Sequence, residues 1–389
     1  MIRILTYKEH PRGSAILDCY LYLAAYVLPF SSEDVLGSRR LNIDGTVITA
    51  KSFLKTHKKA RQRKPNYLAL LQKHGITHVP NTPKQKLEQD WLLAAKLIWE
   101  ADRGLYQYLY RVADVSIEPM TLPTVRRENL WTLLTVKMDE LPKELEAIGE
   151  ICGEPGKKLL DEVFRYDAFS GNAFALKMLE QMDVNVCPYC NRLYTVTLTG
   201  KEGKSRPQFD HYKSKSKYPQ FAISLMNLIP SCGLCNQSKR DETEPVLYPY
   251  SDEMGTSAVF HTKPEKGLRY LTGCQDTQDE FSVTLDIVDS SLPAELQKRI
   301  GRSKDLFHLV QLYNKHKDYI LYLFWKNYIF RDEYLQMLCD EFPTVFHSLQ
   351  DVKTMMYMMD IDPAQWGRRP LAKLTHDIDR EINEMAKLF

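Results

Sequence analysis

Two pairs of cysteines with the spacing C-x-x-C constrain this chain more than any other feature of its sequence. The first pair is Cys187 and Cys190, the second is Cys232 and Cys235, and 41 residues separate them. A closed structural zinc site takes four ligands in a tetrahedron, and one tight turn of this spacing supplies two. One pair could instead be incidental or a redox pair, but a redox pair normally opens a helix in a βαβ unit, and none is visible. The sequence therefore predicts a structural Zn²⁺ held by all four thiolates.

The composition is that of an ordinary globular protein. The 389 residues suit two or three packed units, and the net charge of +2 says little about partners unless the basic residues cluster. Half of the eight cysteines lie in the two pairs, which fits metal-bound thiolates in a reducing compartment better than a disulfide scaffold. We expect the other four to be core residues: Cys19, Cys152, Cys274 and Cys339.

The N-terminus does not have the pattern of a secretory signal peptide. The apolar run from 16 to 30 is too short to span a bilayer comfortably and contains Asp18, so it predicts a buried helix. A cytoplasmic location and no contact with a membrane are therefore expected.

The pattern of apolar residues predicts a mostly helical α+β protein. We expect three parts, which are an N-terminal helical region (1–155), a central region with the cysteine pairs (156–260) and a mostly helical C-terminal region (261–389). In the first part a capping box at Thr82–Gln85 opens a long helix, which Gly104 interrupts.

The central region changes from helical to extended patterns. A helix is expected over 157–182, followed by a β-hairpin whose first strand is 193–198 and whose second reaches Phe209. A short helix should follow the second cysteine pair. Further along, strands are expected near 257–262 and 281–288. Helices are expected within 306–338 and near 370–388.

The dipeptide Asp210-His211 lies between the cysteine pairs, at the end of an expected strand. Hydrolysis of a phosphodiester needs an activated water and stabilisation of charge at phosphorus and at the departing oxygen. His211 could take the proton of that water. Asp210 points to the other side and could bind a hard divalent cation, with the carbonyl oxygen of Asn236 as a second ligand. An Asp-His pair alone is weak evidence for a catalytic site. Its position between the two cysteine pairs makes that evidence stronger.

These residues resemble a known family. The segments Phe209-Asp210-His211, Asn227-Leu228 and Cys232 to Lys239 are similar to an HNH endonuclease of the ββα-metal type with a four-cysteine zinc site. The resemblance covers about 187–240, and it implies a β-hairpin and a helix around a metal ion. It implies that His211 is the general base, that Asn227 orients the loop carrying it, and that Asp210 and Asn236 bind Mg²⁺ or Mn²⁺.

The closest resemblance within that family is to the HNH effectors of bacterial antiphage systems of the Septu or retron-associated type. The residues that carry it are the run from Tyr212 to Pro219 and the run from Pro230 to Asn236. Such effectors usually act with an ATPase partner, so the resemblance implies a partner protein for this chain. The N-terminal helical region lies outside the resemblance.

Basic residues cluster around the Asp-His pair. Eight Lys or Arg and two carboxylates lie between Lys201 and Arg240. We expect four of these lysines to contact phosphates, each contact releasing counterions: Lys213, Lys215, Lys217 and Lys239. The alternative is a solvated loop.

Two further patterns allow several interpretations. Seven Lys or Arg and no acid lie between Lys51 and Lys64, where they could bind DNA, bind an acidic partner or form a solvated face. The aromatic residues of the 319–328 segment have helical spacing, which favours helix core over a platform for stacking bases.

The sequence thus predicts a metal-dependent HNH endonuclease that cuts DNA, as a nuclease effector of antiphage defence. Two other classes of protein remain open. One is a four-cysteine zinc module that binds nucleic acid without cutting it, although such a module needs none of Asp210, His211 and Asn236. The other is a scaffold in a defence complex, in which a partner controls a silent nuclease.

Overall fold

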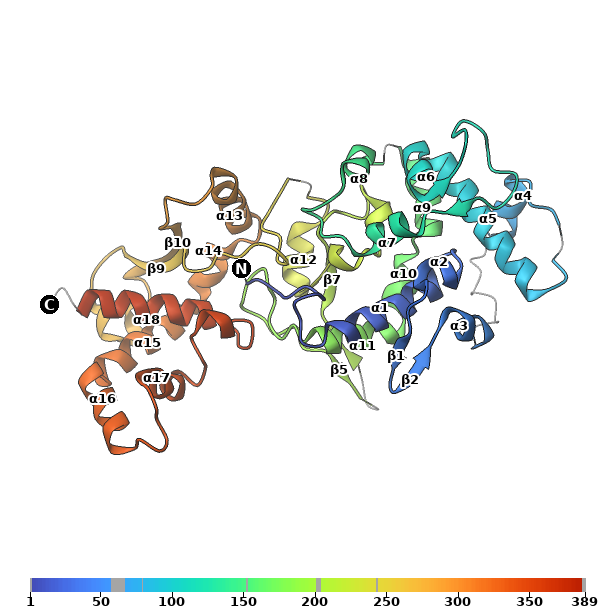
Figure 1. Cartoon of the computed structure of the whole chain (residues 1–389). Coiled ribbons are helices and arrows are strands. Elements are labelled where there is room, and N and C mark those ends of the chain that lie inside the picture. Colours follow the sequence, from blue (N-terminus) through green and yellow to red (C-terminus); the bar gives the residue numbers. More distant parts are fainter. Residues whose placement is uncertain are drawn as a thin grey trace.

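The computed structural model of the protein describes residues 2–56, 67–78, 80–151, 153–200, 204–242 and 244–386. Across these residues helices predominate and the strands form five two-stranded antiparallel sheets, which confirms the mostly helical α+β class. Figure 1 shows the N-terminal helices on the right, β7 and α12 in the middle and the C-terminal helices on the left. No helix among the described residues is long and apolar enough to cross a membrane.

The N-terminal half is built from helices with two short sheets between them. The helices are α1 (Gly13–Val27), α2 (Ser32–Leu36), α3 (Ala50–Thr56), α4 (Tyr67–Lys73), α5 (Pro83–Ala101), α6 (Arg103–Leu109), α7 (Arg127–Thr135), α8 (Lys143–Ile148), α9 (Glu154–Val163), α10 (Tyr166–Ser170) and α11 (Ala173–Met182). The sheets pair β1 (Leu41–Ile43) with β2 (Thr46–Ile48) and β3 (Tyr110–Arg111) with β4 (Thr124–Val125).

Three expectations for this half can be compared directly with the structure. Ten of the fifteen residues of α1 are buried, which confirms the buried helix expected from the apolar run. The capping box is present, with the Thr82 hydroxyl accepting from the Gln85 N–H at 3.2 Å. The break after α5 lies at Asp102 and not at Gly104, because Asp102 has an extended backbone and its carboxylate caps α6.

The centre of the molecule consists of two small sheets and one helix. Its elements are β5 (Leu198–Thr199), β6 (Lys204–Ser205), β7 (Gln208–His211), β8 (Leu228–Ser231) and α12 (Gly233–Lys239). The predicted strand over 193–198 is wrong for most of its length, because only its last residue enters β5 and its apolar side chains are largely exposed. β7 pairs instead with β8, placing His211 opposite Leu228.

The C-terminal part joins one longer hairpin to a group of helices. The hairpin pairs β9 (Ala258–Pro264) with β10 (Phe281–Ile287), close to the two expected strands. The helices are α13 (Ala294–Leu306), α14 (Leu309–Tyr313), α15 (Lys317–Ile329), α16 (Asp332–Glu341), α17 (Leu349–Tyr357) and α18 (Ala372–Ala386). The apolar run from 306 to 338 is therefore divided among several helices.

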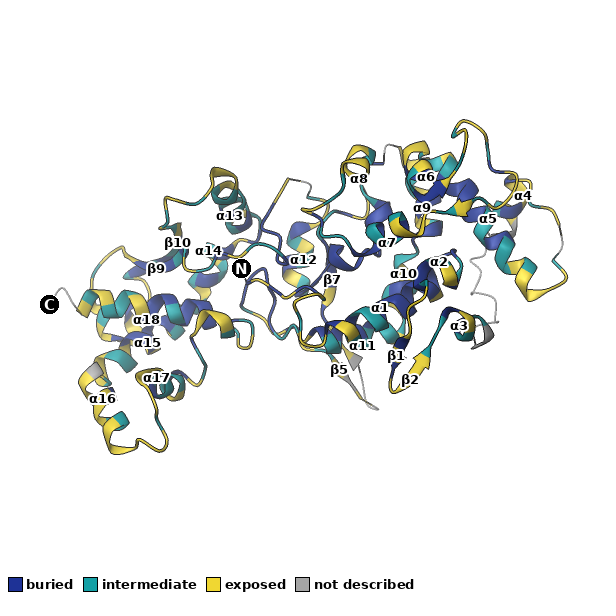
Figure 2. Cartoon of the chain, in the orientation of Figure 1, coloured by how far each residue is buried: buried dark blue, intermediate teal, exposed yellow. Residues whose placement is uncertain are grey.

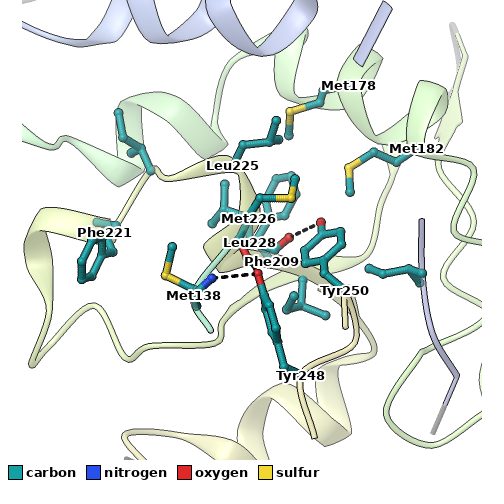
Figure 3. Close-up of a cluster of buried hydrophobic side chains, with 14 of the residues drawn as sticks. Met138, Met178, Met182, Phe209, Phe221, Leu225, Met226, Leu228, Tyr248 and Tyr250 are labelled. Carbon is teal, nitrogen blue, oxygen red and sulfur yellow. Dashed lines mark hydrogen bonds between the residues drawn. The ribbon is translucent and has the colours of Figure 1, made fainter. Parts of the chain in front are cut away.

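A buried cluster of hydrophobic side chains packs around the β7–β8 pair (Figure 3). Tyr248 donates to the Met226 carbonyl at 2.7 Å and accepts from the Met138 N–H at 3.2 Å. Tyr250 donates to the Leu228 carbonyl at 2.9 Å. These bonds satisfy buried polar groups and attach β8 to distant parts of the chain.

Candidate metal centre and active site

The four cysteines of the two pairs come together in one buried group. Their sulfur atoms all lie within 4.8 Å of one another, and Cys190 Sγ is 4.0 Å from Cys232 Sγ. A zinc ion with Zn–S bonds of about 2.3 Å would separate its ligands by about 3.8 Å, so the group fits a tetrahedral ion after a small contraction. The four thiolates therefore form a group that could hold a metal ion such as zinc.

Local backbone structure explains how each pair forms its turn. In the first, the Asn191 N–H donates to the Cys187 carbonyl at 2.8 Å, and Asn191 has a φ of +48°. In the second, Cys232 is the N-cap of α12, and its sulfur accepts from the Cys235 N–H at 3.5 Å. An amide N–H directed at sulfur stabilises a thiolate.

The remaining cysteines only partly match the expectation of core residues. Cys19 is buried, and burial raises the pKa of its thiol to about 11. The expectation is wrong for Cys274, which is exposed, and Cys339 is only half-buried. Cys152 lies outside the described residues.

His211 lies at the end of β7 with its ring in the interior. Its Nε2 is 2.8 Å from the Ala222 carbonyl oxygen, and since that oxygen only accepts, Nε2 carries the proton and Nδ1 keeps a free lone pair. Burial lowers the pKa of His211 to about 3, helped by the charges of Lys215 and Lys239 and opposed by the bond to Ala222. The ring is therefore neutral at pH 7, as a general base must be.

Asn227 holds the loop that follows His211. Its Oδ1 accepts from the Lys213 N–H at 2.7 Å, and its Nδ2 donates to the carbonyls of Lys213 and Phe221 at 3.1 and 2.9 Å. The side chain is fully buried. Its contacts are those expected of a residue that orients the loop after His211.

Asp210 is buried in a network that the sequence did not predict. Tyr189, from the turn between the first two cysteines, donates to Asp210 Oδ2 at 2.5 Å, and Lys239 Nζ lies 3.3 Å from the same oxygen. Lys239 also donates to the His211 carbonyl at 2.5 Å. Burial raises the pKa of Asp210, while Lys239 and Tyr189 oppose that rise. The turn between Cys187 and Cys190, strand β7 and helix α12 thus meet at the Asp210 carboxylate.

The expected ligands of a divalent catalytic ion have other partners here. Asn236 Nδ2 donates to Gln208 Oε1 at 2.7 Å, whereas Asp210 faces Tyr189 and Lys239. A cation at Asp210 would lie beside the Lys239 ammonium, and like charges repel strongly in a buried site. This arrangement does not fit the Mg²⁺ or Mn²⁺ ion that the resemblance implies.

A groove of about 600 Å³ opens beside His211, lined by residues of α10, β7 and α12. Three basic residues line it, which are Arg206, Lys215 and Arg240. Lys215 was expected to contact phosphate, and its ammonium lies 4.9 Å from the centre of the Tyr166 ring. Arg206 and Arg240 were not singled out from the sequence, although each lies within two residues of an element that carries the motif.

The other three lysines expected to contact phosphate are placed differently. Lys213 lines a separate cavity of about 240 Å³, and burial lowers the pKa of its ammonium. Lys217 is half-buried, and its carbonyl accepts from the Ile151 N–H at 3.0 Å. Lys239 is 2% exposed and paired with Asp210, so its ammonium lies in the interior and not on a surface that phosphates approach.

The basic segment and the aromatic run, for which the sequence allowed several interpretations, can now be compared with the structure. Most of the basic segment from Lys51 to Lys64 lies outside the described residues. In the aromatic run, Phe324 is buried as expected, but the core interpretation is wrong for Tyr322, Trp325 and Tyr328, each of which is about half exposed. These three residues follow one another at three-residue steps along the outer side of α15.

Replacing Lys239 with methionine is expected to destabilise the protein by about 3–5 kcal/mol, because it leaves the Asp210 carboxylate buried without its counter-charge. The pKa of Asp210 is already raised by burial and would rise further. A carboxyl group whose pKa is higher in the folded protein than in the unfolded chain lowers the free energy of unfolding as the pH rises from the unfolded pKa to the folded one. The loss of stability caused by Lys239→Met should therefore be larger at pH 8 than at pH 5. Urea unfolding of Lys239→Met at the two pH values measures this.

The matched control is Lys84→Met, since the Lys84 side chain is 82% exposed. It should change stability by about 0.5 kcal/mol or less at either pH. Equal losses for Lys239→Met at pH 5 and pH 8 would contradict the buried ion pair.

No protein-family model matches the chain, and no solved structure matches it. The chain is similar to protein ea31 of Escherichia phage lambda, with 26% identity over 118 residues. The match covers 28% of this chain and 36% of that protein, so the chain spans about a third of its relative's length.

Proposed function

We propose that this protein is an HNH-type endonuclease that hydrolyses phosphodiester bonds in DNA. The observation that carries the proposal is a neutral, buried His211 at the end of an antiparallel strand pair, beside a groove lined by basic residues. A short helix follows the second strand, and Asn227 braces the loop after His211. These parts occur in the order that the resemblance implies.

In the proposed reaction His211 activates the water and the basic residues of the groove bind the phosphates. His211 takes a proton from a water molecule through its free ring nitrogen, the water oxygen bonds to phosphorus, and one P–O ester bond breaks. The departing oxygen takes its proton from solvent. The side chains of Arg206, Lys215 and Arg240 hold the phosphates at the groove, where their positive charge replaces counterions.

The four thiolates have a structural role in this proposal. We propose that they bind Zn²⁺ and hold the first cysteine turn against the start of α12. Because Tyr189 lies in that turn and donates to Asp210, the ion also keeps β7 in place. Zinc so placed would not touch the substrate.

The biological setting is proposed from the sequence resemblance. We propose from this resemblance that the protein is a bacterial antiphage nuclease with an ATPase as its partner. The requirement for Mg²⁺ or Mn²⁺ is likewise a prediction of the resemblance, and the position of Asp210 gives it no support.

The test is a cleavage assay with purified protein. Supercoiled plasmid DNA should be nicked or linearised, and parallel reactions with Mg²⁺, with Mn²⁺ and with EDTA show whether cleavage needs a divalent ion. If the protein alone is inert, the assay is repeated with the protein encoded beside it. Failure to cut DNA under every condition, with the zinc content intact, would reject the nuclease and favour a binding module.

A further inference from the structure

Helices α15, α16 and α17 carry a concentration of exposed apolar side chains. Of the 24 large hydrophobic residues that are exposed among the described side chains, eleven lie between residues 322 and 358. This segment is less than a tenth of the chain. The most exposed of them include Tyr328 (59%), Val345 (61%), Met355 (53%) and Met358 (80%). We call these eleven exposed residues, which lie on α15–α17 and in the loops that join and follow them, the α15–α17 surface.

Figure 2 shows α16 as largely exposed, at the edge of the molecule away from β7 and α12. Buried side chains and hydrogen bonds hold this part together. Leu335 of α16 and Val352 of α17 are buried, and α17 is tied to α15 by hydrogen bonds from Lys326 to the Met356 carbonyl (2.7 Å) and from Asn327 to the Tyr357 hydroxyl (2.8 Å). The exposed apolar residues take no part in these contacts. Patches of this kind mark interaction sites.

The segment 322–358 carries a formal charge of −2, from five Asp or Glu and three Lys or Arg, and its acidic residues gather in α16, α17 and the loops beside them. Residues 331–362 contain seven Asp or Glu and two Lys or Arg, which gives a formal charge of −5, whereas the rest of the chain carries +7. One of the two basic residues, Lys353, is already paired with Asp379 at 3.0 Å. The α15–α17 surface thus combines apolar side chains with negative charge.

This charge decides which occupant the surface suits. Nucleic acid and anionic lipid both carry dense negative charge and would be repelled. A symmetric dimer would place the same patch of each copy against itself and bring the acidic residues of the two α16–α17 parts together. A different protein with an apolar face flanked by Lys and Arg avoids all of these costs.

We propose that the α15–α17 surface docks an amphipathic, basic helix of a partner protein. Exposed methionines suit this role, because their flexible side chains adapt to the shape of an apolar helix face. The acidic residues around them would pair with the lysines or arginines of the partner. The site is separate from the His211 groove, so its occupation can be measured whether or not the protein cuts DNA.

The experiment measures binding of a designed peptide to the full-length protein by fluorescence anisotropy. The probe is an 18-residue helix of leucine and lysine with leucines on one face, and an otherwise identical leucine–glutamate peptide is its control. The test variant combines Tyr328→Gln, Met355→Gln and Met358→Asn, all at positions more than half exposed. Asparagine is chosen at 358 because the backbone there has a φ of +56°.

We expect the basic peptide to bind, the acidic peptide to bind at least about tenfold more weakly, and the triple variant to lose about tenfold in affinity for the basic peptide. A variant with Ile117→Gln and Met120→Gln, which removes exposed apolar residues elsewhere, should bind like the natural protein. Equal binding of both peptides, or no effect of the triple variant, would overturn the proposal. The proposal would also be overturned if the natural protein formed a dimer, or bound phosphatidylglycerol vesicles, and the triple variant did not.

Discussion

Replacing His211 with alanine is expected to lower the rate of DNA cleavage by about 10²–10⁴-fold, because the water would lose its general base. The fold should survive. The substitution removes the contact with the Tyr166 ring (4.4 Å between ring centres) and the bond to the Ala222 carbonyl, which lowers stability, but it leaves in place the four cysteines, which belong to other loops. The measurement combines single-turnover cleavage of plasmid DNA with zinc content and thermal unfolding.

Two matched variants sharpen this test. His211→Gln keeps an N–H that can donate to the Ala222 carbonyl but removes the base, so it should be as inactive as the alanine variant. His347→Ala removes an exposed histidine of the C-terminal region and should cleave like the natural protein. A His211→Gln variant that cleaves at the natural rate would rule out the proposed base.

Replacing Cys187 with serine is expected to unfold the central region and remove its zinc. The Cys187 side chain is fully buried in the four-thiolate group, and the three remaining thiolates would bind the ion much more weakly. Structural zinc contributes about 10–16 kcal/mol in small domains, which is comparable to the whole stability of a typical protein. Zinc content per chain, soluble yield and unfolding temperature measure the effect.

The control for this prediction is Cys274→Ser. Cys274 is exposed and does not belong to the thiolate group, so its loss should leave the zinc content at one ion per chain and the soluble yield unchanged. A soluble, folded Cys187→Ser protein with a full equivalent of zinc would show that the thiolates do not hold the fold.

The parts of the site that the sequence predicted correctly depend on local spacing. Two C-x-x-C turns were enough to predict the four-thiolate group, and the extended pattern before Asp210 was enough to place His211 at a strand end, although the partner strand β8 was not predicted. Asn227 was assigned from the family resemblance, and its three hydrogen bonds fit the assigned role.

The parts that were missed depend on contacts between distant segments. Lys239 looked like a surface residue near a phosphate, but two helical turns after Cys232 its side chain reaches back to Asp210. Tyr189 completes that network from a separate loop, and no periodicity in the sequence joins the two. In the 319–328 run, helical spacing predicted a helix correctly but could not show that α16 and α17 leave the outer side of α15 uncovered.

The buried cluster around β7 and β8 has a consequence for how this site could be transferred to another protein. Its side chains come from before, within and after the segment 187–240, and Tyr20 of α1 also donates to the Ile223 carbonyl at 2.9 Å. Tyr189 stacks on Phe307, with 4.5 Å between ring centres. A cassette of 187–240 grafted onto another scaffold would keep its metal ligands but lose the support on both sides. A graft that keeps the site folded would therefore have to carry the supporting elements on both sides of the motif.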